Sequence, residues 1–189
     1  MSGSVLGRSF FARDATVVAP ELLGKVLVAG VCAGRIVEVE AYRSDDPASH
    51  TFRGPTARNA VMFGPAGHLY VYFTYGMHHC ANVVTGELGD GQAVLLRALH
   101  PLDGIAVMRR RRGGKPDARL TDGPGKLCQA LGIDRTVDGI DLCAGGGDVT
   151  IVDDGTPPPV EPRITARIGI SVATDTPWRW LAPPPPNRV

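Results

Sequence analysis

The sequence predicts an α+β fold in a single domain built on an antiparallel sheet. At 189 residues the chain has the length of one domain and can bury a core without disulfide or metal support. Segments with strand character outnumber helical ones and follow one another directly, whereas wound parallel folds alternate strand and helix. No apolar run reaches the 18 residues of a candidate membrane span, so we expect no membrane partner.

The N-terminal part begins with an apolar cluster that predicts a short helix closed by residues 21–24. Residues 26–31 and 35–42 predict paired strands around a turn at residues 32–34. Residues 43–68 are rich in Gly, Pro, Asp, Ser and Arg and show no clean periodicity, which predicts a long loop. A loop of this length in a compact domain is usually functional or disordered.

The middle of the chain continues with predicted strands at residues 68–75, 80–85 and 92–99. Two helices are expected after them, at residues 104–112 and 123–131. The second is the better marked, because Pro124 lies near its first turn and Gly132 just past its end.

The C-terminal part, residues 145–189, has strand-like pieces in sequence rich in Pro and Gly, notably residues 167–172. The prolines at 183–186 predict a disordered tail. We therefore expect one domain over residues 1–182 and a proline-rich tail over residues 183–189. The N-terminus lacks a basic start followed by an apolar stretch, so we expect no signal peptide and a cytoplasmic location.

Charge and cysteine content say little about partners. The net charge is +1, and 17 of the 20 basic residues are arginine, which suits phosphate contacts but also follows from a GC-rich genome. The four cysteines lie far apart without a CxxC pair, so neither a disulfide framework nor a zinc knuckle is indicated. The triplet His78-His79-Cys80 resembles a metal site, but neighbours on a strand point to opposite faces. No metal is predicted.

The strand at residues 36–42 carries the most informative side chains. Alternation puts Glu38, Glu40 and Tyr42 on one face. A carboxylate beside an aromatic ring on so apolar a segment is either part of a structural ion pair or a poised acid or base. The residues alone leave both interpretations open.

Other features join this strand: His50 in the long loop, Tyr70, Tyr72 and Tyr75 on the tyrosine-rich strand, and Arg97 in an apolar one. Each has an ordinary structural interpretation, since aromatics favour strands and Arg97 can pair with Glu38. Residues 109–112 are interpreted as a solvated helix end rather than a phosphate site. Glu40 and Tyr42, taken together with His50, the strand tyrosines and Arg97, predict a pocket for a flat ring with a carboxylate to activate water. Enzymes that flip a nucleotide and cut its glycosidic bond use such a pocket.

Several ordered motifs then carry a family resemblance: residues 35–42, Ala48-Ser-His50, Arg58-Asn59, Met62-Phe63, residues 69–77, Asn82, residues 94–99 and residues 123–131. They resemble the alkyladenine (3-methyladenine) DNA glycosylase family, in order from about residue 9 to 143 and more loosely to 181. The resemblance implies a single domain around a curved antiparallel sheet with flanking helices. It also implies no cofactor, no metal and a monomer that acts on double-stranded DNA containing damaged purines.

The resemblance implies roles for individual residues. Glu40 matches the general base that activates water, and Arg97 a residue that holds this water and the target phosphate. The residues expected to contact or screen the flipped base are Tyr42, Ala48, His50, Tyr72 and Asn82. The residues expected to contact the DNA are Arg58, Tyr75, His78 and Lys126, with Tyr75 as the intercalating wedge. His78 replaces an aromatic residue that family members often carry, and the loop at residues 44–67 is short of lysine.

The implied activity is excision of alkylated adenine or guanine, hypoxanthine or ethenoadenine, which leaves an abasic site without strand cleavage. One alternative is a binding module for damaged DNA, which would have no use for an ionised Glu40. Another is a nucleoside hydrolase, which would need neither Tyr75 as a wedge nor arginines that contact phosphate.

Overall fold

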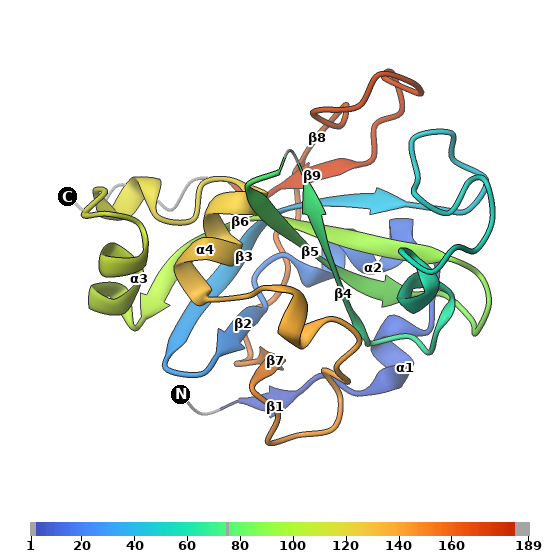
Figure 1. Ribbon diagram of the computed structural model, residues 1–189. Coiled ribbons are helices and arrows are strands. Elements are labelled where there is room, and N and C mark those ends of the chain that lie inside the picture. Colours follow the sequence, from blue (N-terminus) through green and yellow to red (C-terminus); the bar gives the residue numbers. More distant parts are fainter. Residues whose placement is uncertain (1–2, 75, 184–189) are drawn as a thin grey trace.

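The computed structural model describes residues 3–74 and 76–183 (Figure 1). Its strands form one curled antiparallel sheet in the order β1-β7-β2-β3-β6-β5-β4, with β9 pairing to β3 and β8 pairing to β9. The strands are β1 (Ser4–Val5), β2 (Val26–Ala29), β3 (Cys32–Tyr42), β4 (Leu69–Thr74), β5 (His78–Thr85), β6 (Gln92–Asp103), β7 (Val149–Asp153), β8 (Arg163–Thr165) and β9 (Arg179–Leu181). The predicted α+β class with one curved antiparallel sheet is confirmed.

Within the described residues, four short α-helices flank this sheet. They are α1 (Arg8–Phe11), α2 (Ala15–Leu22), α3 (Ile105–Arg111) and α4 (Pro124–Leu131). The Asp14 side chain caps α2 by accepting from the Thr16 amide at 2.9 Å. Helix α2 packs against β3 and β6, and α4 packs against β5 and β6. The two helices predicted in the middle of the chain are confirmed to within one residue at each end, whereas the N-terminal one is two helices.

Two local predictions are wrong. The turn between β2 and β3 is Gly30-Val31, because Ala29 pairs with Cys32 across a hairpin in which Gly30 has a φ of +55°. Residues 32–34 therefore belong to β3. Residues 167–172 form no strand either: among the described residues they have no ladder partner, and they form the loop between β8 and β9.

The sheet has one face on the core and one face on a cavity. Alternate residues of the central strands, Val39, Ala41, Val71, Val83, Val94 and Leu96, lie in the main hydrophobic core and are completely buried. Their neighbours along the same strands point to the other face. Because side chains alternate along a strand, the residues that form the core lie on one face of the sheet and those that face the cavity lie on the other.

No helix within residues 3–74 and 76–183 has the length and apolar character needed to cross a bilayer. All four cysteines are free thiols, as expected from their spacing. The predicted tail begins at residue 183, and residues 184–189 lie outside the described part of the chain.

Candidate active site

A row of directly opposed residues crosses four strands on the cavity face of the sheet. Glu40 on β3 is opposite Leu95 on β6, Leu95 is opposite Asn82 on β5, and Asn82 is opposite Tyr70 on β4. Antiparallel register keeps such cross-strand neighbours about 5 Å apart. Residues separated by more than 40 positions in the sequence are thereby fixed on one surface.

This surface forms the floor of a cavity of about 470 Å³. Its floor residues are Tyr70, Tyr72, Cys80, Asn82, Leu95 and Arg97, and Tyr42 lies at its edge. One wall comes from the long loop between β3 and β4, through Ala48, His50 and Arg58, and another from residues 168–172. The volume is within the range of small-molecule sites and suits a ligand such as a purine.

Glu40 lies beside this cavity and is completely buried. Its Oε2 accepts a 2.8 Å hydrogen bond from the Tyr42 hydroxyl, and its Oε1 accepts one of 2.8 Å from the Ile168 amide. The Arg97 guanidinium lies 3.1 Å from Oε1. All three partners line the cavity, so the carboxylate is held at its boundary by groups that face inward.

Arg97 bridges the two glutamates of β3. Its Nε lies 2.8 Å from Oε1 of Glu38, while its Nη1 reaches Glu40. The register of β3 against β6 shifts on both sides of Glu38, and these irregularities leave Arg97 without a direct partner in the ladder. β-Bulges of this kind change the direction in which a side chain points, here that of Arg97. The pairing of Arg97 with Glu38 is confirmed, and Arg97 also contacts Glu40.

Glu38 has a second partner, Arg179 on β9, whose Nε lies 2.7 Å from the same oxygen. Burial would lower the pKa of Arg97, but Glu40 and Glu38 more than offset it and raise that pKa. Arg97 is thus a permanent cation beside the cavity. In this geometry Glu38 lies between two arginines, whereas Glu40 contacts one of them, Arg97, and lies beside the cavity.

The tyrosines stay neutral hydrogen-bond donors. Burial, followed by the nearby Glu40 carboxylate, raises the pKa of Tyr42 far above its ordinary value. Burial, followed by the neighbouring Cys80, does the same for the pKa of Tyr72. Tyr42 therefore keeps its proton and donates it in the hydrogen bond to Glu40.

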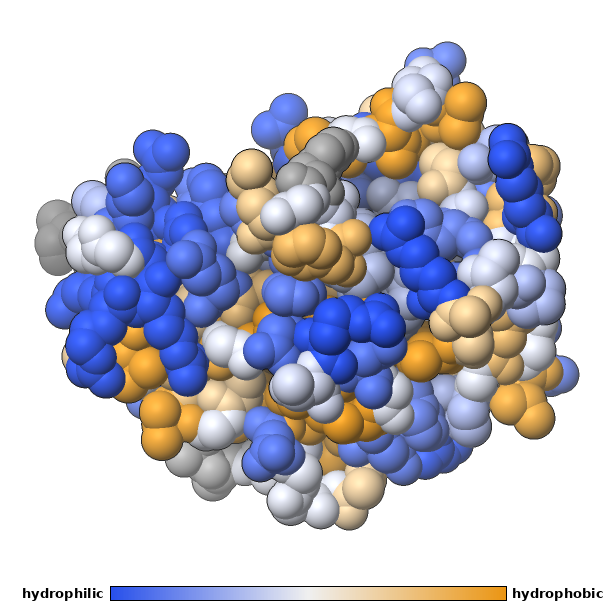
Figure 2. All heavy atoms as spheres, viewed as in Figure 1, coloured by the Kyte–Doolittle hydropathy of each residue, from blue (hydrophilic) through white to orange (hydrophobic). Residues whose placement is uncertain are grey.

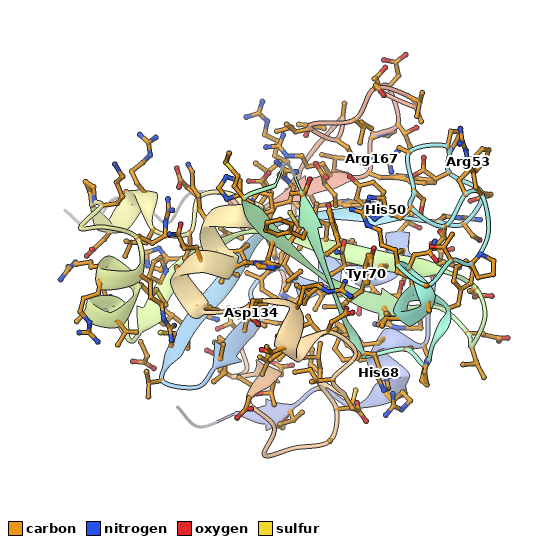
Figure 3. The ribbon with its side chains drawn as sticks, viewed as in Figure 1. His50, Arg53, His68, Tyr70, Asp134 and Arg167 are labelled. Atoms are coloured by element: carbon orange, nitrogen blue, oxygen red, sulfur yellow. The ribbon has the colours of Figure 1, made fainter. Side chains whose placement is uncertain are left out.

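His50 lies against the tyrosines of β4, as Figure 3 shows for His50 and Tyr70. Its ring meets that of Tyr72 edge-on, with centroids 4.5 Å apart, and its Nδ1 shares a 3.2 Å hydrogen bond with the Tyr70 hydroxyl. Burial, and then the Arg58 cation, lower the pKa of His50. The imidazole is therefore neutral at neutral pH. Asn59 fixes this part of the loop by donating to the His50 carbonyl oxygen at 2.8 Å.

The other expected base-contacting residues are also found at the cavity. Asn82 donates to the Tyr70 carbonyl oxygen at 3.3 Å and forms part of the floor, while Ala48 lines the cavity from the loop. All five predicted base-contacting residues, Tyr42, Ala48, His50, Tyr72 and Asn82, therefore line one cavity.

The expected DNA-contacting residues are more scattered. Arg58 lines the cavity mouth and donates to the Phe73 carbonyl oxygen at 3.1 Å. Lys126 pairs with Asp122 at 2.9 Å on the first turn of α4. His78 packs against that turn so closely that a Cβ on Gly125 would lie 3.0 Å from the His78 Cβ. Tyr75 lies outside the described residues.

Sequence reasoning missed three contributors to the site. Cys80 lines the floor, Ile168 supplies an amide to Glu40, and Arg167 is buried behind Tyr42. Cys80 follows from strand alternation, since it is two residues before Asn82. The apolar composition of residues 167–172 predicts a strand, and no local pattern marks Arg167 and Ile168 as neighbours of β3.

Among the described residues, the structure gathers no group of three or more His, Cys, Asp or Glu side chains that could hold a metal ion. His79, from the His-His-Cys triplet, instead packs against the Phe73 ring, with centroids 5.0 Å apart.

Comparison with known proteins identifies relatives along almost the whole chain. The family model for methylpurine-DNA glycosylase matches residues 9–186. A protein of Burkholderia lata named "Putative 3-methyladenine DNA glycosylase" is 56% identical over 184 residues, covering 96% of this chain and 89% of the relative. Proteins with the same name from Carboxydothermus hydrogenoformans and Methanoculleus marisnigri are each 49% identical over 181 residues, covering 93% of this chain and 94% and 93% of theirs.

Proposed function

The chain belongs to the methylpurine-DNA glycosylase family, and from this premise we propose that Glu40 activates a water that releases damaged purines flipped out of duplex DNA. The observation that carries the proposal is the placement of one buried carboxylate, bound by Tyr42, Arg97 and Ile168, at the boundary of an aromatic cavity of about 470 Å³.

The reaction we propose is hydrolysis at C1′ of the target nucleotide. The water oxygen attacks C1′ and gives a proton to Glu40 while the glycosidic C–N bond breaks, and its electron pair leaves with the base. The deoxyribose keeps the new hydroxyl, so the product is an abasic site with the strand intact. Arg97 is a cation 3.1 Å from Glu40, and we assign it to hold the water and the adjoining phosphate.

The base enters between the aromatic side chains. Tyr42 is expected to contact the base on one side, and Tyr72 with His50 on the other. Purines alkylated at N3 or N7 are cationic, so they leave without an added proton, and stacking on tyrosine favours them by roughly 0.5–2 kcal/mol through cation–π attraction. Neutral lesions such as hypoxanthine and ethenoadenine need a proton on the base first. We assign Asn82, which lies on the floor, to screen the exocyclic groups of purines.

Flipping costs a few kcal/mol, and less where pairing is already damaged. We assign Tyr75 as the wedge that offsets part of this cost by stacking in the gap. Phe73 and Met77, which are close to Tyr75 in the sequence, expose apolar surface, as do Ile168 and Val172 on the loop after β8. Figure 2 shows apolar side chains on that loop at the top of the view, and hydrophilic ones over α3 at the left. We propose Arg58, His78 and Lys126 as DNA contacts.

A gel assay on a duplex series tests this function directly. Each duplex carries hypoxanthine, ethenoadenine or an alkylated purine at one position, and alkali after the reaction reveals abasic sites. We expect strand breaks only with the lesion, the enzyme and alkali together. Breaks without alkali would contradict hydrolysis by water alone, since a lyase cuts the strand itself.

A binding titration with the same duplexes and a base-release assay on free nucleosides separate the two alternatives. Tight binding of lesion duplexes without any alkali-labile product would indicate a binding module. Release of bases from free nucleosides that undamaged duplex does not inhibit would indicate a nucleoside hydrolase. The three contacts that hold the Glu40 carboxylate beside the cavity favour a hydrolase of some kind over a binding module.

A further inference from the structure

We propose, on the basis of the glycosylase function above, that Arg167 is a positioning residue that locks Glu40, Tyr42 and two cavity walls into one arrangement. Arg167 does not line the cavity, and its side chain is completely buried. It therefore acts on the reaction only through the groups it holds. Arg167 lies on the loop after β8 (Figure 3).

The guanidinium lies between two aromatic rings. Its central carbon is 4.7 Å from the centroid of Tyr42 and 5.3 Å from that of Trp178. Cations favour such positions over ring faces. Because Tyr42 lines the cavity and Arg167 does not, the guanidinium supports the part of the Tyr42 ring that faces away from the ligand.

The nitrogens of the same group reach two further elements. Nη1 donates to the carbonyl oxygen of Ala41, the residue between Glu40 and Tyr42, at 3.1 Å. Both terminal nitrogens bind the buried Asp46 carboxylate, with Nη2 at 3.0 Å from Oδ1. Asp46 Oδ1 also accepts from the Ala48 amide at 3.0 Å, which shapes the start of the wall that carries Ala48 and His50.

The position of Arg167 in the chain supplies the last link. The next residue, Ile168, donates its amide to Oε1 of Glu40 at 2.8 Å and begins the wall formed by residues 168–172. One side chain thus joins β3, the loop before β4 and the loop after β8. Loss of this link would let the Ile168 amide and the Tyr42 ring shift relative to Glu40.

Stability alone does not explain a buried arginine at this point. Buried ion pairs are often no more stable than apolar replacements of similar volume. Within the described part of the chain, Nε of Arg167 has no hydrogen-bond partner, which is a further cost. A planar, permanently charged fork fits between two rings and against a carboxylate, and lysine does not reproduce this geometry.

The test compares Arg167→Met and Arg167→Lys with a matched control, Arg35→Met. Arg35 also pairs with a carboxylate, Asp154, at 2.8 Å and donates to a backbone carbonyl oxygen, that of Gly24, but it lies away from the cavity. Single-turnover excision and affinity for a lesion duplex are measured where every variant is fully folded. We expect both Arg167 variants to excise about 10- to 100-fold more slowly, with affinity changed less than about threefold, and Arg35→Met to excise like the wild type.

A second readout does not depend on activity. Amide hydrogen exchange at Ile168 and Ala48 should accelerate by at least about tenfold in Arg167→Met and stay unchanged in Arg35→Met. Asp46→Asn should slow excision too, and its combination with Arg167→Met should be no worse than Arg167→Met alone, because the two residues act as a unit.

Three outcomes would overturn the role of Arg167: excision by Arg167→Met as fast as by Arg35→Met, full rescue by lysine, or unchanged exchange at Ile168. A wild-type protein that excises no lesion would overturn the glycosylase function instead. In that case the exchange measurement still decides whether Arg167 holds the two walls.

Discussion

The Tyr42 hydroxyl donates a 2.8 Å hydrogen bond to Oε2 of Glu40, two residues away on the same face of β3. One side chain therefore combines two tasks that could have been separate: its ring lines the cavity, and its hydroxyl orients the carboxylate. The two residues meet because strand alternation puts them on one face. Substitutions can separate the role of the Tyr42 ring from the role of its hydroxyl.

Replacing Tyr42 with phenylalanine should keep the ring and remove the bond to Glu40. A hydrogen bond to a charged group is worth roughly 1.5–3 kcal/mol, so we expect single-turnover excision to slow by about 10- to 100-fold. Affinity for a lesion duplex should stay within about twofold, as judged by fluorescence titration. Tyr42→Ala is the contrasting variant, because it should weaken binding as well. An unchanged rate in Tyr42→Phe would show that the hydrogen bond from Tyr42 does not orient Glu40.

Glu40→Gln should separate binding from chemistry. The amide keeps the shape of the carboxylate but takes no proton from water, so excision should fall by about two or more orders of magnitude while lesion binding persists. Glu38→Gln is the control: Glu38 contacts Arg97 and Arg179 but not the cavity, and a smaller loss is expected. Excision by Glu40→Gln near the wild-type rate would remove Glu40 as the base.

The pH dependence of excision should differ between cationic and neutral lesions. A cationic purine needs only the ionised base, so its rate should rise through one ionisation and then level off. Hypoxanthine also needs a proton, so its rate should fall again at higher pH and give a bell. Single-turnover profiles on matched duplexes distinguish the two shapes. The same bell for both lesions would contradict proton-independent departure of the cationic base.

His50 should make folding stability depend on pH in a predictable direction. Because burial, and then Arg58, lower the pKa of His50 in the folded protein, the unfolded chain binds a proton at this residue more readily. Stability from neutral His50 is therefore fully present above the unfolded pKa of about 6.5 and declines as pH falls below it. Urea unfolding between about pH 7.5 and 5 should show a larger loss for the wild type than for His50→Gln. Equal losses would place His50 in an ordinary aqueous environment.

Much of the site could be predicted because strands alternate. Once β3, β4, β5 and β6 are recognised as strands, the side chains of Glu40, Tyr42, Tyr72, Asn82 and Arg97 must share the face opposite the core. The resemblance to the glycosylase family then supplied roles that alternation alone left open. The family itself is borne out by a family model over residues 9–186.

Two features could not be predicted in this way. The double irregularity around Glu38, which brings Arg97 to both glutamates, depends on the register of β3 against β6 rather than on either strand alone. The segment at residues 167–172 has the apolar composition of a strand, yet it forms a cavity wall. Composition does not reveal that the Ile168 amide is used by a side chain instead of a neighbouring strand.

The sequence by itself determined the α+β class, the antiparallel strands and the face on which each pocket residue of the strands lies, because these follow from local periodicity. Only the tertiary structure decided which residues hold that face in place. The contacts of Arg167 and Ile168 with Ala41, Asp46 and Glu40 join residues 121 to 128 positions apart. Such contacts arise when the sheet closes and the loop after β8 folds back on it. No local pattern encodes them, because each partner alone is compatible with many other structures.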